Sequence, residues 1–351
     1  MRIPLVYSLH SGNLYGTERM ALATAQGLAA DFEPIFLAPA GPAIAEAARL
    51  GFGAINFHNS RDFALKLRRL MSLHPRLAFL ATGVVHSLAL LAWNQLYRRR
   101  VAHLHMVHGG TDERLSYGRK RWLNHRDVTL VAVSKFVRER LLAHSVERRQ
   151  IEVIENFLPA AQVRTAPRRA GFTQPGVRQV AVISRIDPIK RVDLLLDALD
   201  LEPGLGGLSF RIFGGGWDLE TLRARAALRH PNVTFLGFQN QVDVSLAQSD
   251  LLLHLCPVEP FGLALLEAMA AGVPVLAPSS GGAGDLVEED VSGFHFHADC
   301  AASLAARLTE LSAAPADRLT TVVAGGHAAL NRRFAAAARI ADYRRLLEGV
   351  L

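Results

Sequence analysis

The chain has 351 residues, of which 50% are hydrophobic and 20% charged, enough material for two hydrophobic cores of ordinary domain size. Only two cysteines are present, Cys256 and Cys300, in unrelated contexts, so neither a disulfide framework nor a thiolate metal site is indicated. The N-terminal segment MRIPLVYSLHSGN holds an apolar stretch too short for a signal peptide, and we expect a cytoplasmic protein.

The formal net charge of +7 is spread unevenly along the chain. Residues 1–165 contain 22 lysines and arginines against 12 acidic residues, whereas residues 166–351 contain 17 against 20. The basic residues gather in KLRRL (66–70), YRRR (97–100) and GRKRW (118–122), beside apolar or aromatic residues. Such clusters suit a surface that meets anionic phosphates or lipid headgroups, and solvated helix faces are an equally simple interpretation.

Short apolar runs alternate with helical patterns along the first half, as in a parallel sheet buried on both faces. Residues 77–96 approach the length of a membrane helix but carry several polar residues, so we interpret them as a buried strand followed by a helix. The expected strands of this half lie at 3–9, 33–39, 77–83, 103–109 and 128–134.

Residues 159–178 are rich in Pro, Arg and Gly, lack periodicity and predict a linker. The alternation then restarts, with expected strands at 178–186, 208–216, 233–238, 250–256 and 272–278. We therefore predict an α/β protein of two doubly wound parallel-sheet domains, 1–160 and 161–332, with a ligand cleft between them.

Neither half begins with a dinucleotide fingerprint. Gly12 and Gly16 are four positions apart, so the G-x-G-x-x-G spacing is absent, and no acidic residue follows FGGG (213–216) at the required distance. A nicotinamide-dependent enzyme is therefore disfavoured. The three glycines instead predict a tight strand-to-helix turn that requires positive φ.

The stretch EPFGLALLEAMAAG (259–272) predicts a loop followed by an α-helix that ends at Gly272. The free backbone amides of Phe261, Gly262 and Leu263 at the helix N-terminus offer hydrogen-bond donors to a phosphate or a sugar hydroxyl. Gly262 also leaves room for a ligand to approach closely.

Two carboxylates flank those amides. Glu259 lies in the loop, and Glu267 lies inside the helix, from where its side chain leans toward the N-terminal end. Carboxylates accept paired hydrogen bonds from the vicinal hydroxyls of a ribose or hexose. Arg185 and Lys190, at the end of an earlier strand, supply the positive charge that a diphosphate requires.

Taken together, these segments resemble the retaining glycosyltransferases of family 4, the group 1 glycosyl transferases, whose GT-B fold has two facing Rossmann-like domains. In the second half the matching stretches are SRIDPIKRVDLLLDAL, RIFGGG, VTFLGF and SDLLLHLCPVEPFGLALLEAMAAGVPVLAPSSGGAGDLVEEDVSGF. In the first half they are GTER, HMVHGG, VAVSKFVRERL and IEVIENF. The resemblance implies an N-terminal acceptor-binding domain, a C-terminal donor-binding domain, and a closing helix at 333–351 that crosses back to the first domain.

The resemblance also implies roles for individual residues of the donor-binding domain. Arg185 and Lys190 would hold the donor diphosphate, Glu267 the ribose hydroxyls, and Glu259 the donor sugar. The amides of 261–263 would bind sugar or phosphate.

The remaining residues border this donor. Gly16 would approach the diphosphate from the first domain, His108 would lie near the sugar at the reacting centre, and Phe238 would border the nucleobase. His103 and His105 fall on the opposite face of their strand from His108, so one metal ion cannot easily take all three. Two departures from the family pattern, Ser184 before the diphosphate arginine and the loop GNLYGTE, fall in the donor loops.

The expected activity is transfer of a hexose-type sugar from a nucleoside diphosphate to an acceptor hydroxyl, with retention, in the synthesis of cell-surface polysaccharide, lipopolysaccharide or glycolipid. We expect no metal, no cofactor and no nucleic-acid partner. The acceptor, a glycan, a lipid-linked sugar or a small molecule, would meet the N-terminal domain, with peripheral contact to an anionic membrane. A sugar-nucleotide 2-epimerase of the same fold and a non-catalytic nucleotide-sugar-binding protein are the alternatives. The donor base stays open between uracil, guanine and adenine.

Overall fold

The computed structural model describes residues 2–110, 112–239 and 242–349. Its contacts divide the chain into two compact units, and each is described by itself. Unit 1 comprises Met1–Phe157 with Ala336–Leu351, and unit 2 comprises Leu158–Ala335. The expected boundaries at 160 and 332 lie a few residues from these limits. Phe334 belongs to unit 2 because its ring packs edge-on against Phe261, with 5.9 Å between the ring centroids.

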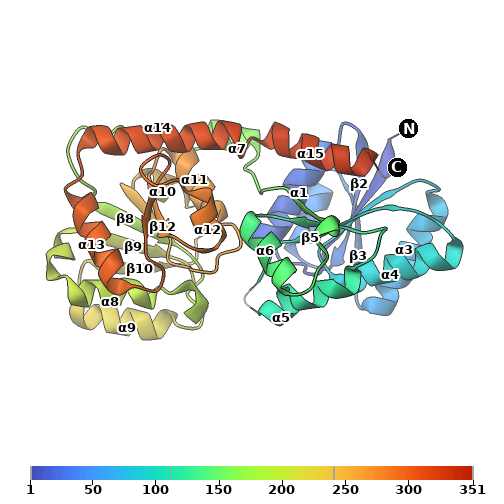
Figure 1. The fold of residues 1–351 in the computed structure, drawn as a ribbon, viewed down its shortest axis with the longest axis horizontal. Helices are drawn as coiled ribbons and strands as arrows, with labels where there is room; N and C mark the ends of the chain where they lie inside the picture. Colours follow the sequence, from blue (N-terminus) through green and yellow to red (C-terminus); the bar gives the residue numbers. More distant parts are fainter. Residues whose placement is uncertain (1, 111, 240–241, 350–351) are drawn as a thin grey trace. The chain divides into compact units, whose positions relative to one another are not determined.

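Unit 1 contains a parallel sheet, of which Figure 1 labels β2, β3 and β5. Its strand order is β3-β2-β1-β4-β5-β6-β7. Each of the five expected runs overlaps one of its strands. The strands β3 and β7 lie outside those runs because they are edge strands, and β3 is largely exposed, so neither needs a long apolar sequence. The strands are β1 (Ile3–Ser8), β2 (Phe32–Pro39), β3 (Gly53–Phe57), β4 (Ala78–Ala81), β5 (Ala102–Val107), β6 (Thr129–Ala132) and β7 (Ile151–Val153).

Helices cover the sheet of unit 1. Helix α15 (Ala336–Glu348) comes from the far end of the chain and packs on α1 (Gly16–Leu28). A Cβ atom added at Gly27 would lie 2.5 Å from the Ile340 side chain, so these two helices are in close contact. The other helices are α2 (Pro42–Arg49), α3 (Ser60–Leu73), α4 (Val84–Tyr97), α5 (Glu113–Ser116), α6 (Lys135–Ala143) and the 3-10 helices Gly118–Leu123 and Arg148–Gln150.

The apolar stretch 77–96 forms strand β4 and most of helix α4, as predicted. His86, Ser87 and Asn94 are buried on the inner face of α4, which explains why polar residues interrupt the stretch. Within 2–110, 112–239 and 242–349, no helix combines the length and the apolar character that crossing a bilayer requires.

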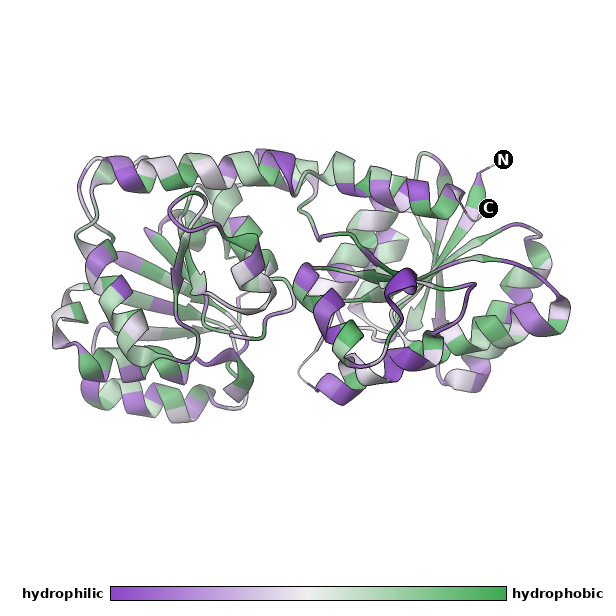
Figure 2. Cartoon of the chain, viewed as in Figure 1, coloured by the Kyte–Doolittle hydropathy of each residue, from purple (hydrophilic) through white to green (hydrophobic). Residues whose placement is uncertain are grey.

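Unit 2 contains a second parallel sheet with the strand order β10-β9-β8-β11-β12-β13. Its core includes Leu195, Phe210 and Phe294, all with less than 1% of their surface exposed. Figure 2 shows hydrophobic residues concentrated in the strands and mixed with hydrophilic ones along the outer helices. The strands are β8 (Gln179–Ile183), β9 (Ser209–Phe213), β10 (Val233–Gly237), β11 (Leu251–Leu253), β12 (Val275–Pro278) and β13 (Phe294–Phe296).

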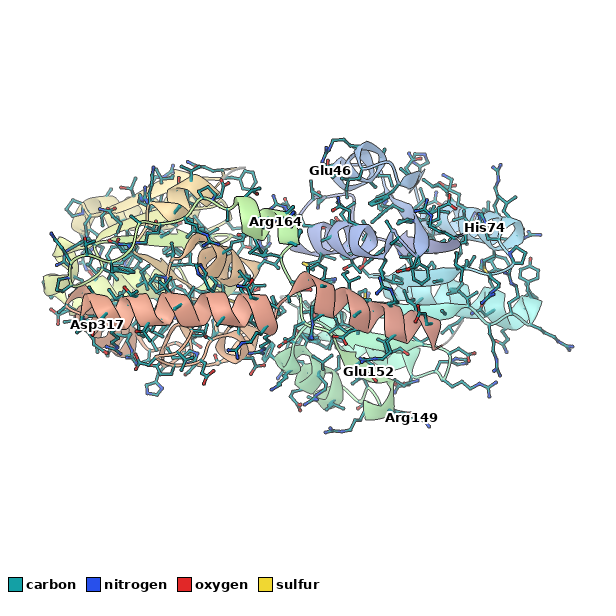
Figure 3. All side chains as sticks on the ribbon, turned by 90° about the horizontal axis from the view of Figure 1, so that it is seen from above. Glu46, His74, Arg149, Glu152, Arg164 and Asp317 are labelled. Carbon is teal, nitrogen blue, oxygen red and sulfur yellow. The ribbon has the colours of Figure 1, made fainter. Side chains whose placement is uncertain are left out.

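The helices of unit 2 include one inside the expected linker. Helix α7 (Ala160–Thr165), which carries the Arg164 labelled in Figure 3, forms within 159–178. Helix α14 begins beside Asp317, also labelled there, and is the longest of the described helices. The helices are α8 (Asp193–Leu201), α9 (Leu219–Arg229), α10 (Asp243–Ala247), α11 (Leu263–Ala271), α12 (Gly281–Leu286), α13 (Ala301–Ser312) and α14 (Ala316–Arg332). Both sheets confirm the predicted class, two doubly wound parallel α/β units.

The glycines after β9 serve two purposes. Gly214 has φ +145°, and a Cβ there would lie 1.8 Å from the Ser184 carbonyl oxygen. Gly216 needs space rather than positive φ, since its Cβ would lie 2.4 Å from the Ile186 carbonyl oxygen. Gly215 has neither requirement. The prediction of positive φ therefore holds at one of the three positions, and close contact with the loop after β8 explains a second.

Because Gly216 is crowded and Gly215 is not, we expect alanine substitutions at these neighbouring positions to differ in their effect on stability. We expect Gly216→Ala to lower the free energy of unfolding of unit 2 by about 1–3 kcal/mol, because a backbone oxygen cannot move aside. Gly215→Ala, in the same loop with open space around it, serves as the matched control and should change stability little. Thermal and urea unfolding would measure both. Equal destabilisation by the two substitutions would contradict the packing explanation.

Candidate functional site

The candidate site of unit 2 lies where the order of its strands reverses. Strands β8 and β11 pair in the middle of the sheet, and the chain runs outward from them in both directions. In open α/β sheets, ligands bind at the carboxyl ends of strands at such a point. Arg185 and Lys190 follow β8, and Glu259 follows β11. The topology therefore brings together residues that are about 70 positions apart in the sequence.

Lys190 and Glu259 form a largely buried ion pair. The Lys190 Nζ lies 2.6 Å from the Glu259 Oε2, and only 17% and 15% of the two side chains are exposed. Burial alone would raise the pKa of Glu259, but the Lys190 ammonium outweighs it and holds that pKa below the usual range. Burial likewise opposes the charge of Lys190, and Glu259 nevertheless raises the pKa of the ammonium. Both groups are therefore ionised at neutral pH.

Arg185 presents its charge to solvent. Its side chain is 58% exposed, and Nη1 lies 3.0 Å from the Oδ2 of the nearly buried Asp187. The Asp187 carbonyl also accepts a hydrogen bond from the Lys190 amide, at 2.8 Å. One short turn thus holds both cations predicted for the diphosphate, one exposed and one buried.

His254 is a residue of this site that the sequence analysis missed. It is buried, and its Nε2 lies 3.6 Å from the Glu259 Oε2. Burial, with Lys190 adding to the effect, lowers the pKa of His254 to about 4 against the opposing influence of Glu259, so the imidazole is neutral at pH 7. The apolar run DLLLHLC contained the only signal, a polar residue directly after a buried strand.

Helix α11 begins and ends as predicted. Gly262 has φ +101° and precedes the first helical residue, Leu263, and Gly272 ends the helix with φ +70°. Phe261 is buried beneath this turn, and Gly262 carries no side chain. The amides of 261–263 thus begin a regular nine-residue helix. Glu267 is half-buried within this helix.

Hydrogen bonds from Ser280 and Gly282 hold the loop that carries Glu259 in place. The amide of Gly282 donates to the Glu259 carbonyl at 2.6 Å, and the Ser280 hydroxyl donates to the Pro257 carbonyl at 2.8 Å. A Cβ at Gly282 would lie 2.1 Å from the Pro260 carbonyl oxygen. The paired glycines of SSGGAG (279–284) are the sequence signal for this close backbone contact.

Two aromatic side chains are exposed at the carboxyl ends of β9 and β10. Phe238, the residue predicted to border the nucleobase, is 70% exposed, and Trp217 is 89% exposed. Strands β9 and β10 are neighbours, so both rings lie along the same edge of the sheet. Trp217 was not among the predicted site residues.

Gly16 and His108 belong to unit 1. Gly16 is the first residue of α1, and His108 directly follows β5. Burial lowers the pKa of His108 to about 4, and His10 adds to the effect. Because each unit is described by itself, the proximity of these residues to the donor residues stays a prediction.

A cavity of about 550 Å³ lies beside His108. It is located at the carboxyl ends of β1, β4 and β5, where the strand order of unit 1 reverses. His10, Thr82 and Lys120 also line it. The His10 Nδ1 and the Thr82 hydroxyl are 2.8 Å apart.

The histidines on the other face of β5 have partners. His103 and His105 both lie within hydrogen-bond distance of the Ser87 hydroxyl, at 2.9 and 2.8 Å. Among the residues that the structure describes, no group of three or more His, Cys, Asp or Glu side chains is arranged to hold a metal ion.

The basic clusters differ from the predicted surfaces in two places. Lys120, within GRKRW, is only 9% exposed and lines the cavity of unit 1 instead of facing solvent. Arg99, within YRRR, donates hydrogen bonds to the carbonyl oxygens of Met71, His74 and Pro75. Both cations are held by local structure, which charge counts along a sequence do not reveal.

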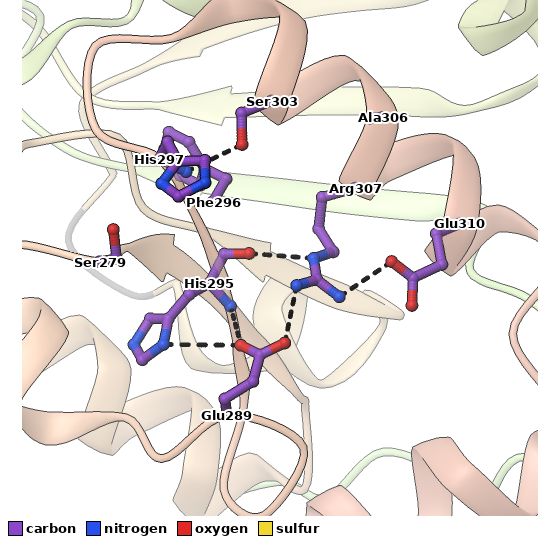
Figure 4. A pocket seen from close by; sticks show the side chains of 9 residues that line it. All are labelled: Ser279, Glu289, His295, Phe296, His297, Ser303, Ala306, Arg307 and Glu310. Carbon is purple, nitrogen blue, oxygen red and sulfur yellow. Dashed lines mark hydrogen bonds and ion pairs between the residues drawn. The ribbon is translucent and has the colours of Figure 1, made fainter.

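Unit 2 has a further cavity, of about 410 Å³, between β13 and α13 (Figure 4). Its cation, Arg307, donates to Glu289 at 2.7 Å and to Glu310 at 2.8 Å. The His295 Nδ1 lies 3.5 Å from the same Glu289 carboxylate. The positive charge of this cavity is already neutralised, which distinguishes it from the cavity of unit 1.

Two family models match the chain one after the other. Residues 14–162 match the model for glycosyltransferase family 4, and residues 164–323 match the model for group 1 glycosyl transferases.

Curated relatives match over shorter segments. The GDP-mannose-dependent alpha-(1-6)-phosphatidylinositol monomannoside mannosyltransferase of Mycobacterium tuberculosis is 35% identical over 150 residues, which cover 38% of this chain and 37% of the relative. The D-inositol 3-phosphate glycosyltransferase of Mycobacterium bovis is 28% identical over 246 residues, 66% of this chain and 51% of the relative. The chain thus spans about half or less of the length of these relatives.

Solved structures match over the whole length. Anabaena Alr3699/HepE in complex with UDP and glucose has a TM-score of 0.82 and 18% identity, covering 99% of this chain and 100% of the other. The apo form of the lipopolysaccharide outer core galactosyltransferase WaaB has a TM-score of 0.78 and 14% identity, with 99% and 100% covered. At such low identity these matches establish the fold, which is GT-B. With both family models and this fold in agreement, the chain belongs to glycosyltransferase family 4.

Proposed function

We propose that the protein transfers a hexose-type sugar from a nucleoside diphosphate to an acceptor hydroxyl, with retention at the anomeric carbon. The observation that carries this proposal is the buried Lys190–Glu259 pair beside the N-terminus of α11, at the strand reversal of unit 2. A polar pair in this position provides a cation for a phosphate and a carboxylate for sugar hydroxyls within one site.

Each donor group has a proposed partner. Arg185, Lys190 and the amides of 261–263 bind the diphosphate, and Glu267 accepts hydrogen bonds from the ribose. Glu259 contacts the sugar. The exposed ring of Phe238 borders the base. Structures similar to this one hold UDP or UDP-glucose, and a sequence relative uses GDP-mannose, so uracil and guanine are the first bases to test.

The chemical problem is the negative charge that develops on the departing diphosphate. We propose that the two cations and the α11 N-terminus stabilise this charge without a metal ion, because they are already in position before the reaction begins. The acceptor hydroxyl then attacks from the face that the diphosphate leaves, and the departing phosphate takes up its proton. Closure of the two units over the donor would exclude water.

His108 has a narrower proposed role. With a pKa of about 4, its imidazole is neutral at pH 7 and carries no extra proton to donate as a general acid. We propose that it forms a hydrogen bond with a hydroxyl of the donor sugar near the reacting carbon, and that Gly16 allows the diphosphate to approach the start of α1.

The acceptor is proposed to bind unit 1, with the reaction at the cytoplasmic face of a membrane. Helices α3 and α4 pack together and carry exposed apolar side chains: Leu65, Leu73, Leu96 and Tyr97. Arginines of the KLRRL and YRRR clusters lie on the same helices or directly after them. Exposed apolar residues beside cations suit peripheral contact with anionic lipid.

Nucleotide binding is the first test of the donor site. We expect one of UDP, GDP and ADP to raise the melting temperature by several degrees, because saturating ligand adds about 2.7 kcal/mol at 100 times the dissociation constant. Glu267→Ala should weaken that nucleotide about tenfold or more, through loss of charged hydrogen bonds. Glu220→Ala, which removes an exposed carboxylate of α9, is the control. Unchanged affinity of the Glu267 variant would remove this residue from the ribose site.

Turnover separates the catalytic function from its alternatives. Formation of the C2 epimer of the donor sugar with no acceptor present would favour a 2-epimerase. Nucleotide binding without turnover on any donor and acceptor would favour a non-catalytic binding protein.

The Lys190–Glu259 pair is tested by a double-mutant cycle. Lys190→Met or Glu259→Gln alone should cost about 3 kcal/mol of stability, since each leaves a buried charge unpaired. The double variant Lys190→Met/Glu259→Gln should recover part of that loss, because neither charge remains. Transfer activity should stay lost in all three variants. Activity in the double variant would mean that the pair only stabilises the fold.

Membrane contact is tested by co-sedimentation with vesicles. We expect binding to vesicles rich in phosphatidylglycerol at about 0.05 M salt, and release near 0.5 M salt, where screening shortens the range of electrostatic attraction. Leu65→Ser/Leu96→Ser should lower the bound fraction, whereas Leu228→Ser, an exposed leucine of α9, should not. Failure to sediment at low salt would contradict the proposal and favour a soluble acceptor.

A further inference from the structure

The cavity of unit 1 has an unusual charge balance. Its lining includes two cations, Arg119 and Lys120, and histidines at positions 10, 86 and 108. Among the residues that the structure describes, no aspartate or glutamate lines it. A cavity with positive charge and no carboxylate differs from the donor site, where Glu259 neutralises Lys190.

Lys120 is the buried cation of this cavity. Only 9% of this residue is exposed, and its Nζ donates one long hydrogen bond of 3.3 Å to the Leu115 carbonyl. No carboxylate of the described residues pairs with this ammonium. Burial of an unpaired charge is unfavourable, so such a lysine gains stability when an anion enters the cavity.

The rest of the wall adds positive character. Helix α4 begins at Val84, next to Gly83, and no side chain in the described part of the chain caps its N-terminus. Gly83, Val84 and Val85 all line the cavity, so the N-terminal end of a 14-residue helix borders it. Backbone amides at a helix N-terminus and a lysine ammonium are both well suited to binding phosphate.

The histidines do not supply the charge. Burial lowers the pKa values of His86 and His108 to about 4, so both imidazoles are neutral at pH 7. Burial, with a contribution from Arg119, lowers the pKa of Lys120 to about 8, so most Lys120 side chains are still protonated at pH 7. The fixed positive charges of the cavity are therefore Lys120 and Arg119.

We infer that this cavity binds a phosphate group of the acceptor, with Lys120 as a direct ligand and with Arg119 and the α4 N-terminus adding to its attraction. Two cations and a helix N-terminus match the charge of a phosphate better than that of a single carboxylate. That the phosphate belongs to an acceptor rests on the proposed function; that the cavity binds phosphate rests on the cavity alone.

The organic part of the acceptor also has a place to bind. Leu115, Arg119 and Trp122 separate this cavity from a neighbouring one of about 640 Å³, and line both. The Trp122 ring is 54% exposed, and the Arg119 guanidinium lies 6.0 Å from its centroid. An aromatic ring beside a cation suits a sugar or polyol ring that carries a charged group.

Lys120→Met tests the inference because it keeps most of the apolar length of the side chain and removes its charge. The probe is sn-glycerol 3-phosphate, with glycerol as the uncharged comparison and titration calorimetry as the measurement. We expect the native protein to bind the phosphate ester and not glycerol, and Lys120→Met to bind it at least tenfold more weakly. Arg126→Met, which removes an exposed charge outside the cavity, is the matched control and should bind as the native protein does.

A structural role for Lys120 makes a different prediction. If the lysine only stabilised the fold, Lys120→Met would lower the melting temperature. We expect the melting temperature to be unchanged or higher, since a buried unpaired charge has been removed. Equal affinity of the native and Lys120→Met proteins for the ester would overturn the inference, and so would Lys120-dependent binding of glycerate with none of glycerol phosphate.

The source of the phosphate is distinguished by a second probe. Binding of soluble glycerol phosphate that depends on Lys120 assigns the site to a soluble phosphorylated acceptor. If instead only vesicles containing phosphatidylglycerol bind in a Lys120-dependent manner, with Arg126→Met unaffected, the phosphate is that of a lipid headgroup. Absence of Lys120-dependent binding to both probes would overturn the inference.

Failure of the inference and failure of the proposed function give different results. If UDP, GDP or ADP binds but neither the phosphate ester nor the vesicles bind through Lys120, the donor site stands and the acceptor class is wrong. If the ester binds through Lys120 and no nucleotide binds, the phosphate site stands and glycosyl transfer is wrong.

Discussion

The buried ion pair between Lys190 and Glu259 joins the loop after β8 to the loop after β11, and the rest of the donor site depends on this connection. An ammonium and a carboxylate with little exposure each need the other, because a lone charge in this position would be strongly unfavourable. The pair fixes Glu259 close to the start of α11, and the same turn that carries Lys190 also carries Arg185. A single electrostatic constraint therefore positions the groups that we propose to bind the sugar and the phosphates.

Backbone contacts make this arrangement rigid. Gly214 and Gly216 allow the loop after β9 to lie against the loop after β8, and Gly282 allows the start of α12 to lie against the loop that carries Glu259. In each case a carbonyl oxygen occupies the space that a Cβ atom would need. Backbone contacts thus pack the loops after β8 and β9 together, and likewise those after β11 and β12, while the ion pair joins the two sets. A site built in this way is organised before its ligand arrives, which is what stabilisation of a developing charge requires.

Much of this could be predicted from the sequence because it depends on local patterns. The buried strands β1, β4, β8 and β9 and the limits of α11 follow from apolar runs and from glycines at helix ends. The edge strand β3 was missed because exposed strands need no such run. His254 and Lys120 were also missed or misplaced, since their burial depends on how distant segments pack. The sequence predicts separate ligands for Lys190 and Glu259. Their positions, about 70 residues apart, do not reveal that the two opposite charges meet in the fold.

Lys190 and Lys120 are both largely buried, but their surroundings shift their pKa values in opposite directions. Glu259 raises the pKa of Lys190 despite burial, whereas burial and Arg119 lower the pKa of Lys120 to about 8. Lys190 can exchange its bond to Glu259 for one to a ligand, provided that the ligand also offers hydroxyls to the carboxylate left behind. Lys120 has no such requirement, because among the described residues it has no carboxylate to lose. A paired lysine therefore favours a ligand that carries both phosphate and hydroxyl groups, as a nucleotide sugar does, whereas an unpaired lysine favours any anion that fits its cavity. If both lysines bind substrate, selectivity at the first comes from chemistry, and selectivity at the second comes from the shape of the cavity around it.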